Sequence, residues 1–275
     1  STSSKVQIHD FTITGSVTAG DTSAAVCGYA TYTDFYNIVD SATVSGSKAY
    51  HGGICGFAYY YENFDSCFNH GTVQGTYNVG GIVGYHYYYS NMAHCGNTAN
   101  ITGTSYNVGG LAGYFYTGVT GTTYKIDTCF NTGSILGDYQ TGGLVGYAYY
   151  AKFYGCENRG AVSGSYHVGG IAGHHYYYGA MENCRNYGDV TGTSYNVGGL
   201  AGYEYYQYNN SVPTCRIYRC ENYGDVSGTY SVGGLLGYTY SNVKTLSCTN
   251  YGDVSATSAT SSGGAGGLVG YNYYY

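Results

Sequence analysis

Cys67-Phe68-Asn69-His70-Gly71-Thr72-Val73 is the stretch that decides the fold, because its pattern, Cys-x-Asn-x-Gly-x-(Val/Ile), returns along the chain. Further copies begin at Cys129, Cys156, Cys184, Cys220 and Cys248, and the copy at Cys95 has Ala99 in the glycine position. Each copy is followed by a Gly-Gly-x-x-Gly block whose last glycine recurs about every 28 residues. Repetition at a period of roughly 20–50 residues indicates a repeat architecture before any local propensity is considered.

The spacing within one copy predicts a β-strand. Cys67, Asn69, Gly71 and Val73 are two residues apart, so they share one face of a strand. No 3.6-residue apolar pattern appears within the period, which leaves no room for a helix. The sequence therefore predicts an all-β fold, a parallel β-solenoid of about nine coils. Residues 1–275 are expected to form a single domain, with degenerate coils in 1–50, regular coils in 51–275 and insertions near 117–124 and 207–216.

Two polar columns are predicted to form ladders inside the solenoid. Stacked cysteines point the same way, so we interpret them as small buried thiols rather than bridged pairs, with Cys215 in an insertion as the one candidate for a disulfide. The asparagine amides are expected to bond their equivalents above and below. The cysteines are Cys67, Cys95, Cys129, Cys156, Cys184, Cys220 and Cys248, and the asparagines are Asn69, Asn97, Asn131, Asn158, Asn186, Asn222 and Asn250.

Apolar columns complete the predicted core. One precedes the cysteines and consists of Phe64, Met92, Ile126, Phe153, Met181, Ile217 and Leu246. The other follows the double glycines and consists of Val26, Ile54, Ile82, Leu111, Leu144, Ile171, Leu200, Leu235 and Leu268.

Composition excludes several classes of protein. Charged residues make up 9% of the chain and the net charge is −6, so it is not a polybasic nucleic-acid binder. No apolar run approaches the ~20 residues of a membrane-spanning helix. Low charge and abundant Ser, Thr, Gly and Tyr favour an extracellular or cell-surface location. The chain starts at Ser1, so we expect either a removed leader or an excised segment.

The repeats resemble a known family. Gly143-Leu144-Val145-Gly146-Tyr147, Gly267-Leu268-Val269-Gly270-Tyr271 and the intervening Cys-x-Asn-x-Gly-x-Val strands are similar to GLUG-motif repeats, over about Val26 to Tyr271. Such repeats occur in large exported or surface-anchored bacterial proteins. The resemblance implies a right-handed parallel β-helix and a cell-surface role, but it does not imply a catalytic activity. This chain departs from the family after the Gly-Tyr step, where tyrosine replaces the usual Asn, Ser and Gly.

Tyrosine accounts for 41 residues, and its placement is columnar. Adjacent columns in a strand point to opposite faces, so at least one is predicted to lie outside. An exposed aromatic strip along a rod indicates an interaction surface, while a purely stiffening aromatic ladder is the structural alternative. The predicted interaction strip consists of Tyr59, Tyr60, Tyr87, Tyr88, Tyr116, Tyr149, Tyr150, Tyr176, Tyr177, Tyr205, Tyr206, Tyr240, Tyr273 and Tyr274.

The sequence predicts no catalytic residues, no metal site and no cofactor. No carboxylate pair with a nearby base recurs on one face, and the repeated Gly-Gly-x-x-Gly blocks open no helix. Asp189, Asp225 and Asp253 stack on successive coils, which favours solvated acids over the alternative of a calcium site.

Three functions remain open from the sequence. The preferred hypothesis is a non-enzymatic extracellular protein that self-associates, end to end or laterally, into a filament or surface fibre. The first alternative is a surface adhesin whose tyrosine strip binds glycans or a host protein. The second is an engineered scaffold loaded with tyrosine for charge hopping or cross-linking. The strand pattern reaches both ends of the sequence, which fits a segment of a longer protein or ends that meet in a filament.

Overall fold

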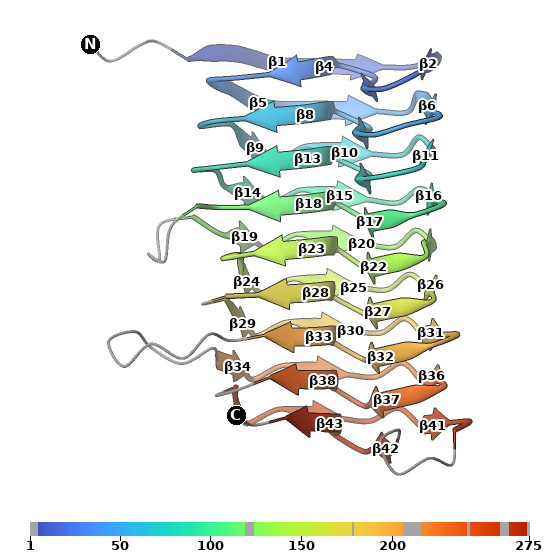
Figure 1. Cartoon of the computed structure of the whole chain (residues 1–275). Coiled ribbons are helices and arrows are strands. Elements are labelled where there is room, and N and C mark those ends of the chain that lie inside the picture. The colour runs from blue at the N-terminus through green and yellow to red at the C-terminus, as the bar shows by residue number, and fades with distance from the viewer. Residues whose placement is uncertain are drawn as a thin grey trace.

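Each strand pairs in parallel with its equivalents in the coils before and after, as the computed structural model shows (Figure 1). The structure describes residues 5–118, 124–177, 179–205, 216–240, 243–258 and 264–273. Within these ranges every regular element is a β-strand. The described residues therefore contain no helix that is long and apolar enough to cross a membrane. The coils stack into a rod from the N-terminal to the C-terminal end (Figure 1). The all-β parallel solenoid expected from the sequence is confirmed.

Four sheets run the length of the rod. The first is 16-stranded, because after β5 each coil contributes two short strands to it. Its strands are β1 (Val6–Ile13), β5 (Thr33–Asp40), β9 (Asn63–Asp65), β10 (Phe68–Asn69), β14 (Met92–Ala93), β15 (Gly96–Asn97), β19 (Ile126–Asp127), β20 (Phe130–Asn131), β24 (Lys152–Tyr154), β25 (Glu157–Asn158), β29 (Ala180–Glu182), β30 (Arg185–Asn186), β34 (Arg216–Tyr218), β35 (Glu221–Asn222), β39 (Lys244–Leu246) and β40 (Thr249–Asn250).

The second sheet has nine strands. They are β2 (Ser16–Ala19), β6 (Thr43–Gly46), β11 (Val73–Gly75), β16 (Ile101–Gly103), β21 (Ile135–Leu136), β26 (Val162–Gly164), β31 (Val190–Gly192), β36 (Val226–Gly228) and β41 (Val254–Ala256).

The third sheet also has nine strands. They are β3 (Ser23–Ala24), β7 (His51–Gly52), β12 (Val79–Gly80), β17 (Tyr106–Gly109), β22 (Tyr139–Gly142), β27 (Tyr166–Gly169), β32 (Tyr195–Gly198), β37 (Tyr230–Gly233) and β42 (Ala265–Gly266).

The fourth sheet, called the tyrosine sheet below, has nine strands as well. They are β4 (Cys27–Ala30), β8 (Cys55–Tyr59), β13 (Val83–Tyr87), β18 (Ala112–Tyr116), β23 (Val145–Tyr149), β28 (Ala172–Tyr176), β33 (Ala201–Tyr205), β38 (Leu236–Tyr240) and β43 (Val269–Tyr273). Nine stacked strands delimit about eight turns, slightly fewer than the nine coils expected. The right-handed sense implied by the family resemblance stays a prediction, as does the division into one domain.

The core follows the columns of the sequence. The main apolar cluster contains both residues after the double glycines from Ile54 to Leu236, such as Ile82 and Val83, together with the buried part of the Phe64 column and the cysteines. Leu268, which is also predicted to lie in the core, is 49% exposed. A second, smaller cluster of valines and isoleucines fills the end of the coil between the second and third sheets. Residues before each cysteine, among them Ser66 and His94, have positive φ, so the chain bends there between two half-strands. This bend splits the first sheet into paired short strands.

The predicted core position of Leu246 is wrong. Thr245, rather than Leu246, is in register with the buried Ile217. Leu246 pairs with Tyr218 on the other face and its side chain is 48% exposed. The reason is spacing, because the core position lies three residues before each cysteine and Leu246 lies only two before Cys248.

The glycines of the repeat permit close contact between coils. A Cβ atom at Gly133 would overlap the carbonyl oxygen of Ala99 in the preceding coil. The same overlap recurs between Gly160 and Gly133. The coils therefore approach too closely at this corner for any side chain to fit. The predicted insertions near 117–124 and 207–216 and the disulfide candidate Cys215 lie wholly or largely outside the described residues.

Candidate functional site

The outer face of the tyrosine sheet is built by the alternation within each strand. In β13, Tyr85 and Tyr87 are half-exposed, while His86 between them is fully buried. Successive side chains of a strand point to opposite faces, so both tyrosines lie outside. The first of these positions forms the central column, which consists of Phe57, Tyr85, Tyr114, Tyr147, His174, Tyr203, Tyr238 and Tyr271. The second forms the strip column, which consists of Tyr59, Tyr87, Tyr116, Tyr149, Tyr176, Tyr205, Tyr240 and Tyr273.

A third column lies where the chain turns out of the sheet. It consists of Tyr60, Tyr88, Tyr150 and Tyr177, all half-exposed, whereas the equivalent Tyr206 and Tyr274 lie outside the described residues. These tyrosines have φ between 55° and 71°, in the left-handed region. The turn rotates their rings to the outer side, so the expectation that adjacent columns face opposite sides does not hold here. Both columns of the predicted strip are therefore outside.

The left-handed turn is held by the neighbouring coils. A bulky residue in this region costs on the order of 1–3 kcal/mol, so other contacts must offset the cost. The Tyr60 N–H donates to the Tyr87 carbonyl at 2.9 Å, and the Tyr88 N–H donates to the Tyr116 carbonyl at 2.8 Å. The rings add edge contacts, with the centroids of Tyr87 and Tyr88 4.4 Å apart at 83°. The backbone ladder thus continues through the turn.

Aromatic contacts, some stacked and some edge-to-face, connect the coils along the face. Ring centroids in the central column are 4.5 Å apart for Tyr85 and Tyr114, with an interplanar angle of 4°. In the strip column, Tyr176 and Tyr205 are 4.5 Å apart at 16°. Such pairs contribute about 0.5–1.5 kcal/mol each beyond area burial. The face is consequently ordered before any partner binds.

Several phenols of the tyrosine face have raised pKa values. Partial burial raises the pKa of Tyr85, Tyr149 and Tyr203 to about 12. Desolvation is the main cause, and the neighbouring phenols add to it, because a phenolate would stand beside other phenolates. These phenols therefore remain neutral, with their hydroxyl groups available as donors and acceptors.

The central column is not part of the strip predicted from the sequence. The sequence nevertheless contains a signal for this column, because alternation along the strand places Tyr85 on the same face as Tyr87. A further exposed stack, Tyr187, Tyr223 and Tyr251, was also missed. It lies at the first sheet, one residue after the asparagines.

A shallow groove of about 490 Å³ opens beside the central column. Its walls include Tyr166, Tyr195 and Tyr238, and its floor includes His167, Asn196 and Ser231. Asn196 hydrogen-bonds the His167 ring at 3.0 Å, and burial lowers the pKa of His167 to about 4, so the imidazole is neutral at pH 7. The groove combines flat aromatic walls with neutral polar groups.

Ionisable side chains lie beneath the tyrosine sheet. Glu62 and His86 are fully buried, with 3.9 Å between Glu62 Oε2 and His86 Nε2. Burial raises the pKa of Glu62 to about 8 and lowers that of His86 to about 3, so both are neutral at pH 7. Glu62 Oε1 accepts the Tyr32 N–H at 2.9 Å, but Oε2 and both His86 nitrogens have no partner.

A second buried pair lies further along the same corner. His175 Nδ1 is 2.8 Å from Glu204 Oε2, and His175 Nε2 donates to the Ala151 carbonyl at 2.9 Å. Burial lowers the pKa of His175, but the charge and hydrogen bond of Glu204 outweigh that effect and the pKa is raised. Both pairs are at most 1% exposed to solvent.

The asparagines form a continuous amide ladder. Each Nδ2 donates to Oδ1 of the next coil at 2.6–2.8 Å and to a backbone carbonyl two residues on. The side chains from Asn69 to Asn222 are fully buried, so the ladder satisfies groups that water cannot reach.

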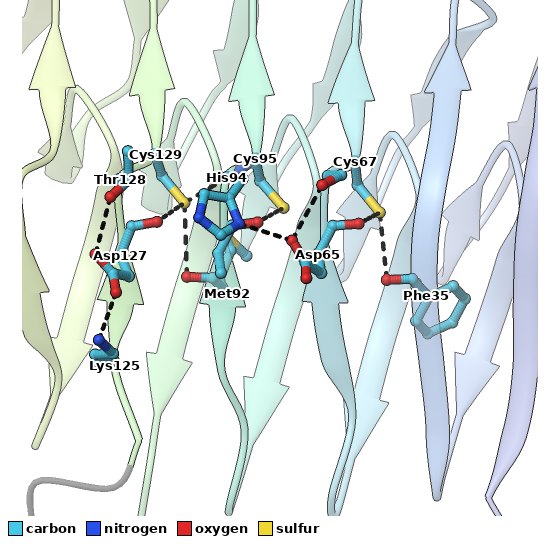
Figure 2. Close-up of polar contacts among 12 residues, drawn as sticks. Phe35, Asp65, Cys67, Met92, His94, Cys95, Lys125, Asp127, Thr128 and Cys129 are labelled. Atoms are coloured by element: carbon cyan, nitrogen blue, oxygen red, sulfur yellow. Dashed lines mark hydrogen bonds and ion pairs between the residues drawn. The ribbon is translucent and has the colours of Figure 1, made fainter.

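The cysteines of the column form no disulfides with one another. Their thiols contact backbone carbonyl oxygens instead. Figure 2 shows Cys67, Cys95 and Cys129 with their sulfurs directed at carbonyl oxygens. Cys129 Sγ lies 3.3 Å from the Asp127 oxygen and 3.6 Å from the Met92 oxygen. These thiols are packing groups of the core.

The outer acids are bound by backbone groups of the following coil. Asp189 Oδ1 accepts the Asp225 N–H at 3.0 Å, and Asp225 Oδ1 accepts the Asp253 N–H at 2.9 Å. Among the described residues, no group of three or more His, Cys, Asp or Glu side chains is arranged to hold a metal ion.

Comparison with known proteins identifies the repeat. Residues 75–102 and 164–191 match the model described as the GLUG motif, which confirms the resemblance expected from the sequence. No curated protein matches the chain. Among solved structures, a candidate immunoglobulin A1 protease from Bacteroides ovatus aligns with 92% of this chain and 78% of its own, at 16% identity and a TM-score of 0.46. At these values the alignment says nothing about activity.

Proposed function

We propose that this chain, a β-solenoid built of GLUG-type repeats, is an exported structural protein that self-associates laterally through its tyrosine face. The observation that carries the proposal is the continuous half-exposed aromatic surface along the tyrosine sheet. Aromatic patches of this extent are typical of interaction surfaces. The face runs along the rod, so association would be side by side and would build a bundle or surface fibre.

The order of the face supports this role. Stacked neighbours such as Tyr205 and Tyr240, with ring centroids 4.9 Å apart, already have fixed positions. Tyrosines held in this way lose little side-chain entropy when a partner binds, which favours association. The absence of charge on the phenols also avoids repulsion between like faces.

A non-enzymatic role is supported by the position of the two buried pairs of histidine and glutamate. Glu62, His86, His175 and Glu204 lie beneath the sheet and are at most 1% exposed. A macromolecular substrate could not reach them without opening the coil. The low charge of the chain and the exported proteins in which GLUG repeats occur support a location outside the cell.

Sedimentation velocity over a range of concentrations, together with electron microscopy, tests the proposal. We expect the wild type to form elongated side-by-side species. The triple variant Tyr87→Ser, Tyr149→Ser and Tyr205→Ser should stay monomeric with an unchanged circular dichroism spectrum. The matched control, Tyr187→Ser with Tyr223→Ser at the first sheet, should assemble as the wild type does. A wild type that is monomeric at every concentration contradicts the proposal.

The groove favours a second candidate, a surface adhesin that binds glycans. Sugar rings stack on aromatic faces and use neutral hydrogen-bonding groups, both of which the groove offers. A glycan array with the wild type and with Tyr195→Ser tests this function. Loss of a specific glycan signal in the variant, with the rod intact, would support it. Binding that is equal in both proteins, or absent from both, would reject the groove as the site.

A further inference from the structure

A column of tyrosines on the third sheet is distinct from the tyrosine face. It is called the flank column here and consists of Tyr77, Tyr106, Tyr139, Tyr166, Tyr195 and Tyr230. Tyr139 begins β22 and Tyr166 begins β27, and the two are Cα partners in register. Their ring centroids are 4.5 Å apart and their planes differ by 5°, the closest and most parallel contact of this column.

The register brings equivalent atoms of the two rings together. Both side chains leave the sheet in the same direction from paired positions, and their planes are nearly parallel. The carbons ortho to the hydroxyl of Tyr139 therefore lie beside those of Tyr166, and hydroxyl lies beside hydroxyl. This is the arrangement from which two phenoxyl radicals can combine.

Access of water and oxidant to the phenol groups distinguishes Tyr139 and Tyr166 from the stacked pairs of the central column. Tyr139 and Tyr166 are half-exposed at the start of their strands, so an oxidant can reach the rings and water can accept the phenolic protons. Tyr85 and Tyr114 stack equally closely and are also half-exposed, but burial raises the pKa of Tyr85 to about 12, whereas the pKa of Tyr139 is raised with no shift that large. A buried phenol loses its proton with difficulty, which disfavours its oxidation.

We propose that Tyr139 and Tyr166 are a site of oxidative phenol coupling, in which a peroxidase using hydrogen peroxide joins the two rings. Each ring loses one electron and its phenolic proton to become a phenoxyl radical. The radicals combine through one carbon–carbon bond between ortho carbons, and the two ortho hydrogens move to the oxygens to restore the phenols. Overall the pair loses two hydrogen atoms, and one peroxide is reduced to two waters. The product is a covalent brace between β22 and β27.

Trypsin makes the product identifiable. Cleavage after Lys125 and Lys152 places Tyr139 in peptide 126–152, and cleavage after Arg159 and Arg185 places Tyr166 in peptide 160–185. The protein is treated with a haem peroxidase and limiting hydrogen peroxide, at a dilution where sedimentation shows only monomer. Mass spectrometry then looks for the two peptides joined with the loss of two hydrogens, and fragmentation locates the bond. Free N-acetyltyrosine in a parallel reaction verifies that the oxidant is active.

The variants assign the bond to these residues. Tyr166→Phe keeps a stacked ring but lacks the hydroxyl, so the bond between residues 139 and 166 should disappear, whether or not other tyrosines of the two peptides are joined. Tyr139→Phe should have the same effect. Tyr176→Phe is the matched control in the same tryptic peptide and should leave the product in place. The inference is overturned if the wild type gives no bond between residues 139 and 166 while N-acetyltyrosine is coupled, or if the bond assigned to this pair persists in Tyr166→Phe. Because the reaction is followed in monomers, its failure would leave the proposed assembly unaffected.

Discussion

Asp40 lies in register with Asn69 at the start of the amide ladder, where a carboxyl group takes the place of the amide of later coils. The amides donate in one direction, from Asn69 to Asn97 and onward. Asn69 Oδ1 is therefore the atom that an amide at position 40 would donate to. Asp40 Oδ2 is buried without a partner, and burial raises the pKa of this carboxyl to about 6. The first rung of the ladder is incomplete.

Replacing Asp40 by asparagine should complete the first rung of the amide ladder. Asp40→Asn supplies an Nδ2 donor to Asn69, and we expect stabilisation of about 1 kcal/mol, the usual value of one buried hydrogen bond. The folded state holds the Asp40 proton up to about pH 6, whereas the unfolded chain loses it near its ordinary value of 3.8. Stability of the wild type therefore falls between these pH values and then stays level. Urea unfolding at pH 4 and pH 7 should show a larger advantage of the variant at pH 7. Asp65→Asn, an exposed control, should bring no gain.

Glu62 should make the fold less stable in alkali. Its pKa is raised from 4.5 to about 8, so the folded state retains a proton that the unfolded chain releases. The stabilisation from this proton is present below pH 4.5 and is lost as the pH rises through about 8. Glu62→Gln should flatten the decline across this window, as measured by thermal unfolding at several pH values. The control Glu221→Gln alters a half-exposed carboxyl and should keep the wild-type slope; equal slopes in wild type and Glu62→Gln would contradict the prediction.

An interruption in the middle of the amide ladder should be costly. Asn131 is fully buried, accepts from Asn97, and donates to Asn158 and to the Gly133 carbonyl. Asn131→Ala leaves buried groups without partners, at about 1–3 kcal/mol each. The unfolding midpoint in urea should fall clearly, while Thr132→Ala on the exposed face should change it little. A variant as stable as the wild type would show that the ladder adds nothing to the fold.

Cys27 should be the most reactive thiol among the described column and edge cysteines. It is half-exposed on β4, and its pKa is lowered to about 7, first by the hydrogen bond with Cys55. Burial raises the pKa of Cys55 well above its usual value. Iodoacetamide labelling of the folded protein, followed by peptide mass analysis, should modify Cys27 with a midpoint near pH 7. Cys129 should react only after unfolding, and its early labelling would show that the core opens.

Much of this fold could be predicted because a parallel solenoid converts sequence period into spatial register. The Cys67 and Asn69 columns follow from a spacing of two within a strand and about 28 between coils. The tyrosine surface was predicted only in part. Alternation correctly describes Tyr85 and Tyr87, but at Tyr60 the strand has ended and a left-handed turn redirects the ring. Local alternation carries no information about such a turn.

The sequence by itself determined which residues stack on one another, since like positions of a repeat must meet when identical coils pair in parallel. Only the tertiary structure decided what faces across the coil, as with Glu62 beside His86, and how closely Tyr139 approaches Tyr166. Those contacts depend on the shape of the coil's cross-section, which is set by bends and packing between strands far apart in each repeat. Periodicity describes the direction along the rod and leaves the perpendicular plane undetermined.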